Sequence, residues 1–428
     1  MTEATRPVSL PGELWISAKL EDHRLADVAG ETKAQIERLF SGVDLAGKRI
    51  AIGAGSRGID QLATVVGATV AALQARGARP FLFPAMGSHG GGTAEGQTMM
   101  LASFGITEES MGAPIEASME TVELGRTASG TRLLASRPAI EADAMLFVNR
   151  VKPHTDFSSD RVGSGLRKML VIGLGKIEGA FEYHRAAFQQ GYEPMILEVS
   201  DEILGRFPAI YGLALVEDGY HHLSHIEAMT SAQIVEREPV LLRQARDWMP
   251  RLPFDRIDVL ILDEMGKNIS GAGMDPNVTG RATNGLPRPD RKADVAIIYV
   301  RDLTPESHGN AIGVGAADLV SARLVEQIDK PFTYTNALSA MTPYAAQIPM
   351  HFATDAECLR AALRMCGIEA ADARIVRLRS TLALDRAVVT GVYAREIAAR
   401  SDLTLLESHD EWRFTPEGNL PANGLSNG

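Results

Sequence analysis

The chain has 428 residues, which at roughly 150 residues per domain predicts two or three domains and a core that folds without disulfides or structural metals. Its formal net charge of −11 argues against non-specific binding to nucleic acid or to an anionic membrane, because both need basic patches. A hydrophobic share of 45% and a charged share of 23% exclude the disordered, collagen-like and coiled-coil classes.

The two cysteines, Cys358 and Cys366, have neither CxxC nor Cys/His ligand spacing, which excludes zinc ribbons and disulfide scaffolds. The first residues do not place a basic segment before an apolar core, as a signal peptide does. No apolar run reaches the length of about 18 residues that a membrane span needs. We therefore expect a cytoplasmic protein.

Apolar runs rich in Val, Ile and Leu alternate with helical patterns along the chain. This predicts an α/β fold in which mostly parallel sheets are flanked by helices, with ligands at the carboxyl ends of strands. Strands are expected, in chain order, over residues 49–54, 79–85, 144–149, 169–173, 211–216, 258–263, 295–300, 331–335 and 387–392. Helices are expected over residues 32–40, 59–76, 93–104, 316–327 and 355–366.

One segment marks a domain boundary. Residues 249–254 read Met-Pro-Arg-Leu-Pro-Phe, and prolines at this spacing end the preceding helical pattern before a new buried strand begins. We expect a domain over residues 1–250, a second over 255–415, and a loose tail over 416–428 that is rich in Gly, Asn and Pro.

Four glycine-rich turns follow expected strands, and the first reads AIGAGSRGI. Its glycines spell GxGxxG, but a dinucleotide site also needs an acidic residue about 20 positions later, where the chain reads QARGARP. An NAD-dependent dehydrogenase is therefore the weaker interpretation. Arg57, a cation at a strand end, suits a carboxylate or a phosphate.

The second turn is AMGSHGGGTAEGQ, in which glycines flank His89. Glycines on both sides of a histidine let the backbone approach a ligand and leave the imidazole uncovered. The alternative is a loop histidine without a role.

The third segment holds Lys152, His154, Lys168, Lys176 and His184 within 33 residues. Lys168 follows a Gly-Ser-Gly turn at the start of an expected apolar strand, so it is either a surface residue or aimed at a bound group. His184 is a candidate metal ligand or base. GLGKIEGA resembles a phosphate loop but lacks the Ser or Thr that follows the lysine in a Walker motif.

The fourth segment, LDEMGKNISGAGMDPNVTGRATNG, contains Lys267, Asp275, Asn277 and Arg281. Polar loops of this length are usually functional, and its acidic residues do not follow EF-hand spacing. A separate HHLSH segment at residues 221–225 could chelate a metal, but a solvated helix start is the preferred interpretation.

Together these residues make the chain similar, over roughly residues 45–400, to the nickel-dependent lactate racemase family. Members of that family hold nickel through a pincer nucleotide, a pyridinium-3,5-bisthiocarboxylic acid mononucleotide. One lysine forms a thioamide with it, one histidine completes the nickel coordination, and two further histidines act as acid and base.

Residue by residue, the resemblance implies that Lys168 in SGLRK is the covalent anchor and that His184 in EYHRA is the nickel ligand. His89 in Gly-Ser-His and His154 in KPHTDF match the two acid/base histidines. The implied cofactor contacts are Arg57, Ser88, Gly90 and Lys176. The implied substrate contacts are Arg57, Lys267, Asn277 and Arg281.

The match departs from the family in three places. The aspartate of the family's Asp-x-Thr-Arg motif is replaced by Ala54, and the arginine that follows histidine in the lactate enzymes is replaced by Gly90. The family's lysine after the DxN segment has no clear counterpart, for which Lys267 or Arg281 could substitute. These departures make lactate itself a less favoured substrate.

The resemblance implies an isomerase that inverts C2 of a 2-hydroxy acid, lactate-like or a larger sugar acid, by hydride transfer to the cofactor and back. The C2 proton is very weakly acidic, so a side-chain base alone is poorly matched to the reaction. The first domain would bind cofactor and catalyse, and the second would close a site in the cleft between them. Enzymes that make the cofactor are the expected partners. The alternatives are an NAD-dependent 2-hydroxyacid dehydrogenase and a non-catalytic carrier of nickel or pincer nucleotide.

Overall fold

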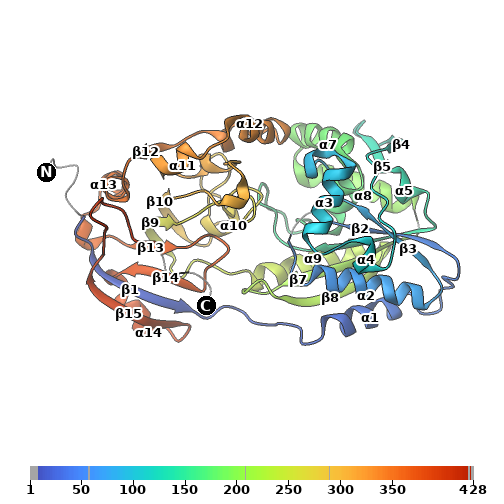
Figure 1. Ribbon diagram of the computed structural model, residues 1–428, viewed down its shortest axis with the longest axis horizontal. Coiled ribbons are helices and arrows are strands. Elements are labelled where there is room, and N and C mark those ends of the chain that lie inside the picture. Colours follow the sequence, from blue (N-terminus) through green and yellow to red (C-terminus); the bar gives the residue numbers. More distant parts are fainter. Residues whose placement is uncertain (1–7, 56–57, 208, 289, 423–424, 426–428) are drawn as a thin grey trace. The chain divides into compact units, whose positions relative to one another are not determined.

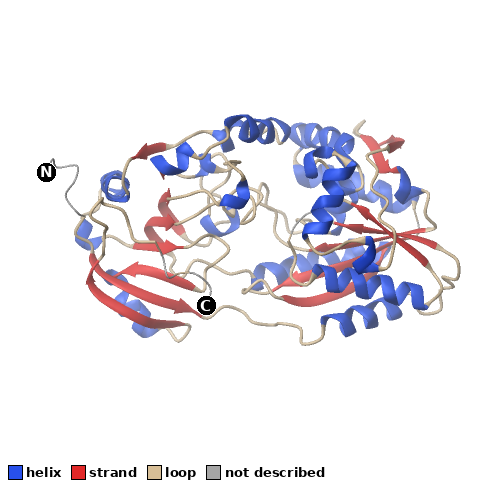
Figure 2. Cartoon of the chain, in the orientation of Figure 1, coloured by secondary structure: helices blue, strands red, loops and turns tan. Residues whose placement is uncertain are grey.

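The computed structural model describes residues 8–55, 58–207, 209–288, 290–422 and 425. These residues form two compact units, each an α/β structure with a mixed, mostly parallel sheet flanked by helices (Figures 1 and 2). The predicted fold class is thereby confirmed. The N-terminal unit spans Glu21–Met249, and the C-terminal unit combines residues 8–20 with the described residues from Pro250 onward. Within the described residues, no helix combines the length and the apolar character that crossing a membrane requires.

The N-terminal unit contains a five-stranded sheet in the order β3-β2-β6-β7-β8, in which the first four strands are parallel and β8 is antiparallel. Its strands are β2 (Arg49–Ala54), β3 (Arg79–Pro84), β6 (Ala144–Arg150), β7 (Ile210–Glu217) and β8 (Leu223–Thr230), with a separate hairpin of β4 (Thr121–Arg126) and β5 (Arg132–Ser136). Its helices are α1 (Val28–Leu39), α2 (Leu62–Ala75), α3 (Ala94–Ser103), α4 (Glu108–Met111), α5 (Arg137–Ile140), α6 (Leu166–Lys168), α7 (Lys176–Gln190), α8 (Tyr192–Arg206) and α9 (Ser231–Trp248).

Alternate residues of this sheet enter two separate cores. In β6, Leu146 and Val148 pack toward α1 and α2, whereas Met145 and Phe147 pack toward α7, α8 and α9. A sheet buried on both faces explains why its strands are continuous apolar runs in the sequence.

The C-terminal unit contains an eight-stranded sheet in the order β12-β11-β10-β9-β13-β14-β1-β15, and its last three strands are antiparallel. The strands are β1 (Pro11–Ala18), β9 (Arg256–Leu262), β10 (Asp294–Val300), β11 (Leu319–Ser321), β12 (Met350–Phe352), β13 (Ile375–Leu378), β14 (Arg386–Thr390) and β15 (Leu403–Glu411). The helices are α10 (Pro276–Thr279), α11 (Ala322–Glu326), α12 (Lys330–Ser339), α13 (Asp355–Cys366) and α14 (Ala394–Ala399).

Both ends of the chain differ from the predicted domain ranges. The first strand, β1, pairs with β14 and β15, so residues 8–20 belong to the C-terminal unit. The described part of the tail is packed rather than loose, since Leu420 and Leu425 are each 2% exposed. Arg301 donates to the Leu420 carbonyl and Arg377 donates to that of Pro421. Pairings between distant segments of this kind leave no local signal in the sequence.

Three predicted elements were wrong. Residues 169–173, predicted as a strand, form a buried π-helical turn after α6, because a short apolar run reads the same in a buried strand or helix. Residues 331–335 lie in α12, whose first turn is capped by Asp329. The predicted helix over residues 316–327 contains β11 and then the short α11.

Candidate functional site

The segments that follow β2, β3 and β6 leave the same end of the N-terminal sheet, which we call the carboxyl edge. In the order β3-β2-β6-β7, β2 connects to β3 on one side and β6 connects to β7 on the other, so the connections that leave these two adjacent strands run in opposite directions. Such a switch in direction is where open α/β sheets bind ligands. His89 follows β3 and His154 follows β6. Arg57, which follows β2, lies outside the described residues.

His154 is held in a loop that the backbone closes on itself. Lys152 and Ser164 exchange two backbone hydrogen bonds of 2.9 and 2.8 Å at the base of the loop. Gly163 is required beside them, since a Cβ there would lie 2.4 Å from the Lys152 carbonyl oxygen. His154 is 6% exposed, and its Nδ1 accepts the Asp156 backbone N–H at 3.0 Å. In the neutral ring the proton is therefore on Nε2.

Aromatic contacts connect His154 with His184. His154 stacks on Phe157 at 4.4 Å and on Tyr192 at 5.8 Å between ring centroids. Tyr192 in turn makes an edge contact with His184, at 6.2 Å between ring centroids. Burial, followed by the charge of Asp156, raises the pKa of Tyr192 to about 12, so its hydroxyl stays protonated. Sequence reasoning missed both Phe157 and Tyr192, although Phe157 stands within the KPHTDF segment.

His184 lies on α7 in a form suited to a metal. Burial, together with the nearby positive charge of Lys168, lowers its pKa to about 4. The ring donates a hydrogen bond to the Ala180 carbonyl, one turn earlier on the helix. His184 is therefore neutral at pH 7, with one nitrogen oriented by the helix backbone and the other carrying a lone pair, which is how imidazole binds metals.

Lys168 is half-buried at the end of α6, and groups from β6 and α9 hold that helix in place. Asn149 at the end of β6 donates to the Gly165 carbonyl at 2.8 Å. The wholly buried Glu238 of α9 accepts the Arg167 backbone N–H at 2.9 Å, and a Cβ on Gly165 would lie 2.5 Å from that carboxylate. Burial raises the pKa of Glu238 to about 7, against the effect of the Arg167 N–H. A carboxyl group from a distant helix thus caps the segment that carries Lys168.

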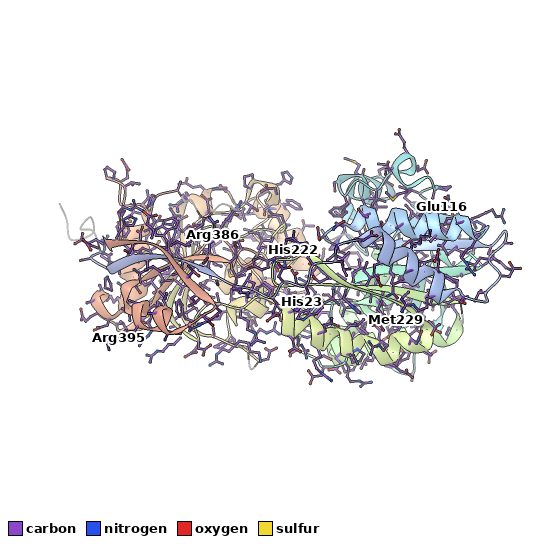
Figure 3. The ribbon with its side chains drawn as sticks, turned by 90° about the horizontal axis from the view of Figure 1, so that it is seen from below. His23, Glu116, His222, Met229, Arg386 and Arg395 are labelled. Carbon is purple, nitrogen blue, oxygen red and sulfur yellow. The ribbon has the colours of Figure 1, made fainter. Side chains whose placement is uncertain are left out.

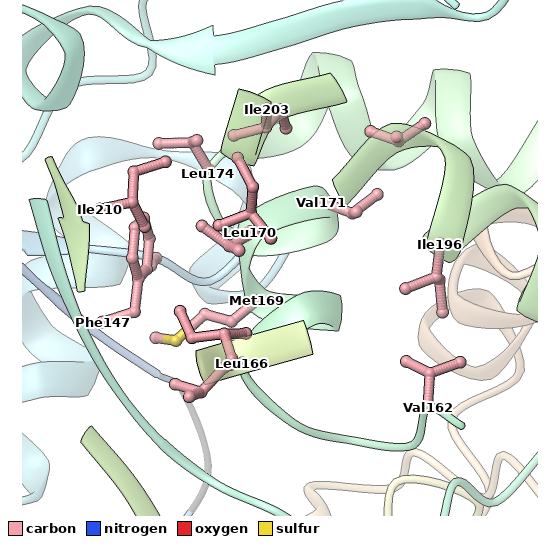
Figure 4. Close-up of a cluster of buried hydrophobic side chains, with 14 of the residues drawn as sticks. Phe147, Val162, Leu166, Met169, Leu170, Val171, Leu174, Ile196, Ile203 and Ile210 are labelled. Carbon is pink, nitrogen blue, oxygen red and sulfur yellow. The ribbon is translucent and has the colours of Figure 1, made fainter. Parts of the chain in front are cut away.

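The rest of the α6 segment is embedded in protein. The Arg167 guanidinium, 2% exposed, donates to Ser200 Oγ at 2.8 Å and pairs with Asp201. Leu166 and Leu170 enter the core beneath (Figure 4). The backbone that bears Lys168 is therefore fixed from several sides.

His89 lies in a loop of unusual backbone conformation. Gly87 and the three residues Gly90–Gly92 all have positive φ angles, between 60° and 68°. A Cβ on Gly90 would lie 2.6 Å from the Gly96 backbone, so the loop packs closely on the start of α3. His89, Ser88 and Gly90 remain partly exposed, and their predicted contact with a cofactor stays a prediction.

Lys176 does not have the predicted cofactor-binding geometry. Its side chain is 1% exposed, and its Nζ donates to the Pro84 carbonyl at 2.8 Å and to Gln97 Oε1 at 2.7 Å. Burial lowers its pKa to about 8. We therefore correct the assignment, because the amine faces the interior of the protein.

The predicted substrate residues of the C-terminal unit lie between β9 and β10. Lys267 is half-buried and donates to the Gly271 carbonyl at 3.1 Å, and Asn277 donates to Asp275. Arg281 is 7% exposed, pairs with Asp318 at 3.0 Å, and donates to the carbonyls of residues 285, 295 and 296. These contacts make Arg281 structural rather than a substrate contact. The roles of Lys267 and Asn277 stay predictions.

The HHLSH segment is the turn before β8 and the first part of that strand, not a helix start (Figure 3). Among the described residues, only Asp22, Asp218 and His222 form a group of three His, Cys, Asp or Glu ligand atoms within 4.8 Å. Arg24 lies 2.6 Å from Nε2 of the same imidazole, and Asp218 already accepts three backbone N–H groups. This cluster organises a turn.

No family model and no curated protein matches this chain. Among solved structures, the chain is similar to the lactate racemase apoprotein from Thermoanaerobacterium thermosaccharolyticum, with a TM-score of 0.52, 15% identity, and coverage of 88% of this chain and 99% of that chain. A protein from Thermotoga maritima has a TM-score of 0.48 and 17% identity, with coverage of 66% and 72%. The resemblance predicted from the residues is thus confirmed for the fold.

Proposed function

We propose that this protein is a racemase or epimerase that inverts C2 of a 2-hydroxy acid with the help of a nickel-pincer nucleotide. The observation that carries the proposal is the meeting of three groups at the carboxyl edge. A half-buried lysine, Lys168, lies near a neutral imidazole, His184, and Tyr192 connects that imidazole with His154. The fold shared with a lactate racemase apoprotein supports the same conclusion.

The residues present fit the proposed cofactor. Lys168 offers an amine for a thioamide bond, and His184 offers one imidazole lone pair. Within the described chain, His184 belongs to no group of three close His, Cys, Asp or Glu ligand atoms, which fits a metal that takes its other donors from a bound cofactor. Two thio-carbonyl arms are soft donors that suit nickel beside one imidazole. When bound, the cofactor would supply a reversible acceptor for the hydrogen on C2.

The chain's own histidines would move the hydroxyl proton. In its neutral form, His154 presents an Nε2–H that can donate a hydrogen bond to the oxygen on C2. As an imidazolium, the ring could give that oxygen its Nε2 proton, and Nδ1–H would then turn from the Asp156 backbone N–H to the Asp156 carboxylate, 3.8 Å away. The neutral ring left behind would carry its proton on Nδ1 and could take the hydroxyl proton back at Nε2. His89 would serve the opposite enantiomer, and near-neutral imidazoles suit both directions of transfer.

The dehydrogenase alternative has less support from the geometry. Gly53, the first glycine of GxGxxG, is a packing residue, since a Cβ there would lie 2.8 Å from the Phe147 ring. β3 ends at Pro84 and continues as Ala-Met-Gly-Ser-His, without the acidic residue that binds a ribose in dinucleotide sites.

The test is co-expression with cofactor-making enzymes, then a screen of enantiopure 2-hydroxy acids, including sugar acids, by chiral chromatography. We expect one substrate to be converted to its C2 epimer by protein that carries nickel and the covalent adduct between Lys168 and the cofactor. Protein that carries both but converts none of the acids would favour the carrier interpretation. NAD-dependent oxidation by protein without adduct would favour the dehydrogenase.

A further inference from the structure

The buried lysine at the start of α7 lies directly under the loop that carries His89. Lys176 is among the largest side chains that the described structure buries completely, and its φ angle of +56° is in the left-handed region that non-glycine residues rarely adopt. Burying an amine and holding such a backbone both cost stability. The contacts that this residue makes are therefore expected to serve a purpose.

Gln97 of α3 links Lys176 to the loop by hydrogen bonds to both. Its Oε1 accepts from Lys176 Nζ at 2.7 Å, and its Nε2 donates to the Gly87 carbonyl at 2.9 Å and the His89 carbonyl at 3.2 Å. Gln97 is itself 0% exposed. A lysine amine that also donates to the Pro84 carbonyl turns the oxygen of the amide toward itself, which leaves the NH2 group for the two loop carbonyls.

The loop has particular need of such support. Gly87 and Gly90–Gly92 take positive φ angles, and glycine backbones lose more conformational freedom on ordering than any other residue. The two carbonyls that Gln97 binds belong to Gly87 and His89, so the short peptide between them is held at both ends.

We propose that Lys176 and Gln97 are positioning residues for His89. They hold the backbone of His89 in place through the side-chain amide of Gln97. The catalytic consequence rests on the proposed function, because it requires that His89 transfers a proton. The bracing of the loop does not depend on it.

The test uses the full chain with Gln97→Glu, which keeps the acceptor for Lys176 and removes both donors, and Lys176→Met, which removes the amine at similar length. The matched control is Gln35→Glu, since Gln35 is a buried glutamine of the same unit that accepts the Ala228 N–H at 3.1 Å, away from the loop. Hydrogen exchange of amides 86–92 and the NMR titration of the His89 imidazole are measured without cofactor.

Both test variants should speed exchange in the loop by about tenfold and shift the His89 titration, while Gln35→Glu keeps wild-type values for both. In cofactor-loaded enzyme, kcat should fall by about tenfold while KM stays within about twofold. If Lys176→Met does not fold, Gln97→Glu decides alone.

Wild-type loop exchange and titration in the test variants would overturn the proposal, and so would equal changes in Gln35→Glu. The loop measurements need no turnover. If the wild-type enzyme is inactive but the test variants show the expected loop changes, the proposed function is contradicted, while the positioning role of Lys176 and Gln97 is still supported.

Discussion

Two clusters of buried ionisable groups, one in each unit of the molecule, respond to burial in opposite ways. At the carboxyl edge of the N-terminal unit, burial moves Lys176, His184 and Glu238 toward their neutral forms, with pKa values of about 8, 4 and 7. Their contacts are mainly backbone groups and a side-chain amide. Groups whose pKa values are perturbed by burial in this way cluster at functional sites.

In the C-terminal unit the buried groups remain charged because they are paired. Asp355 is 0% exposed and binds Arg301 at 2.8 Å and Arg323 at 2.9 Å, and Asp263 binds Arg301 at 2.6 Å and Arg377 at 2.8 Å. Burial acts to raise the pKa of Asp355, but these guanidinium groups bring it below its ordinary value. Equal burial therefore favours the neutral form where opposite charges do not offset it and leaves the charged form in place where guanidinium groups pair with the carboxylate.

The largest expected effect is loss of the covalent adduct. Lys168→Ala should abolish both the adduct seen in the intact mass of denatured holo-protein and all turnover, because no other amine is expected to replace it. Lys152→Ala, in the adjacent loop, is the matched control and should keep the adduct. An adduct that persists in Lys168→Ala would refute the anchor assignment.

Metal binding and proton transfer should separate at the histidines. His184→Gln should lose nickel, measured by metal analysis, since its imidazole is the proposed protein ligand. His89→Gln and His154→Gln should retain nickel and lose about 10²- to 10⁴-fold in kcat. Full nickel in active His184→Gln would remove its ligand role.

In the C-terminal unit, substitution of a buried, charge-paired residue should change stability instead of activity. Asp355→Asn should lower the free energy of unfolding by about 3 to 5 kcal/mol, because it leaves buried guanidinium groups without their partner. The exposed pair of Lys33 and Glu37 provides the control, and Glu37→Gln should change stability by less than about 0.5 kcal/mol. Denaturant unfolding measures both, and a cost for Asp355→Asn as small as the control would contradict the account of this region.

The smallest effect depends on pH. The folded chain keeps the Glu238 proton up to about pH 7, whereas the unfolded chain loses it near 4.5, so stability from this group is present below pH 4.5 and is lost as the pH rises through 7. Glu238→Gln should therefore match the wild type at pH 4 and exceed its stability at pH 8 by up to about 3 kcal/mol. Equal unfolding curves at pH 8 would show that burial does not perturb this carboxyl group.

Much of the fold was predictable because it is local. The strand predicted over residues 49–54 and the helix predicted over 355–366 match β2 and α13 residue for residue, since apolar runs and capping residues act within a few positions. The run at residues 169–173 was misassigned, because its hydrophobicity reports burial and not backbone geometry.

The candidate site was predictable only in part. His89, His154, Lys168 and His184 stand in glycine-rich or polar segments that mark them in the sequence. Their supports do not stand out there, since a glutamine inside a helix or a tyrosine at the start of one is an ordinary residue until the fold gives it partners.

The sequence by itself determined the alternation of strands and helices and the residue types available for chemistry, because each depends on neighbours along the chain. Only the tertiary structure decided that β1 completes the sheet of the other unit, that Lys176 and Arg281 face inward, and that Tyr192 connects two histidines. Those outcomes depend on which distant groups come together to satisfy buried charges and polar atoms, and hydrogen-bond partners far apart in the chain carry no local pattern.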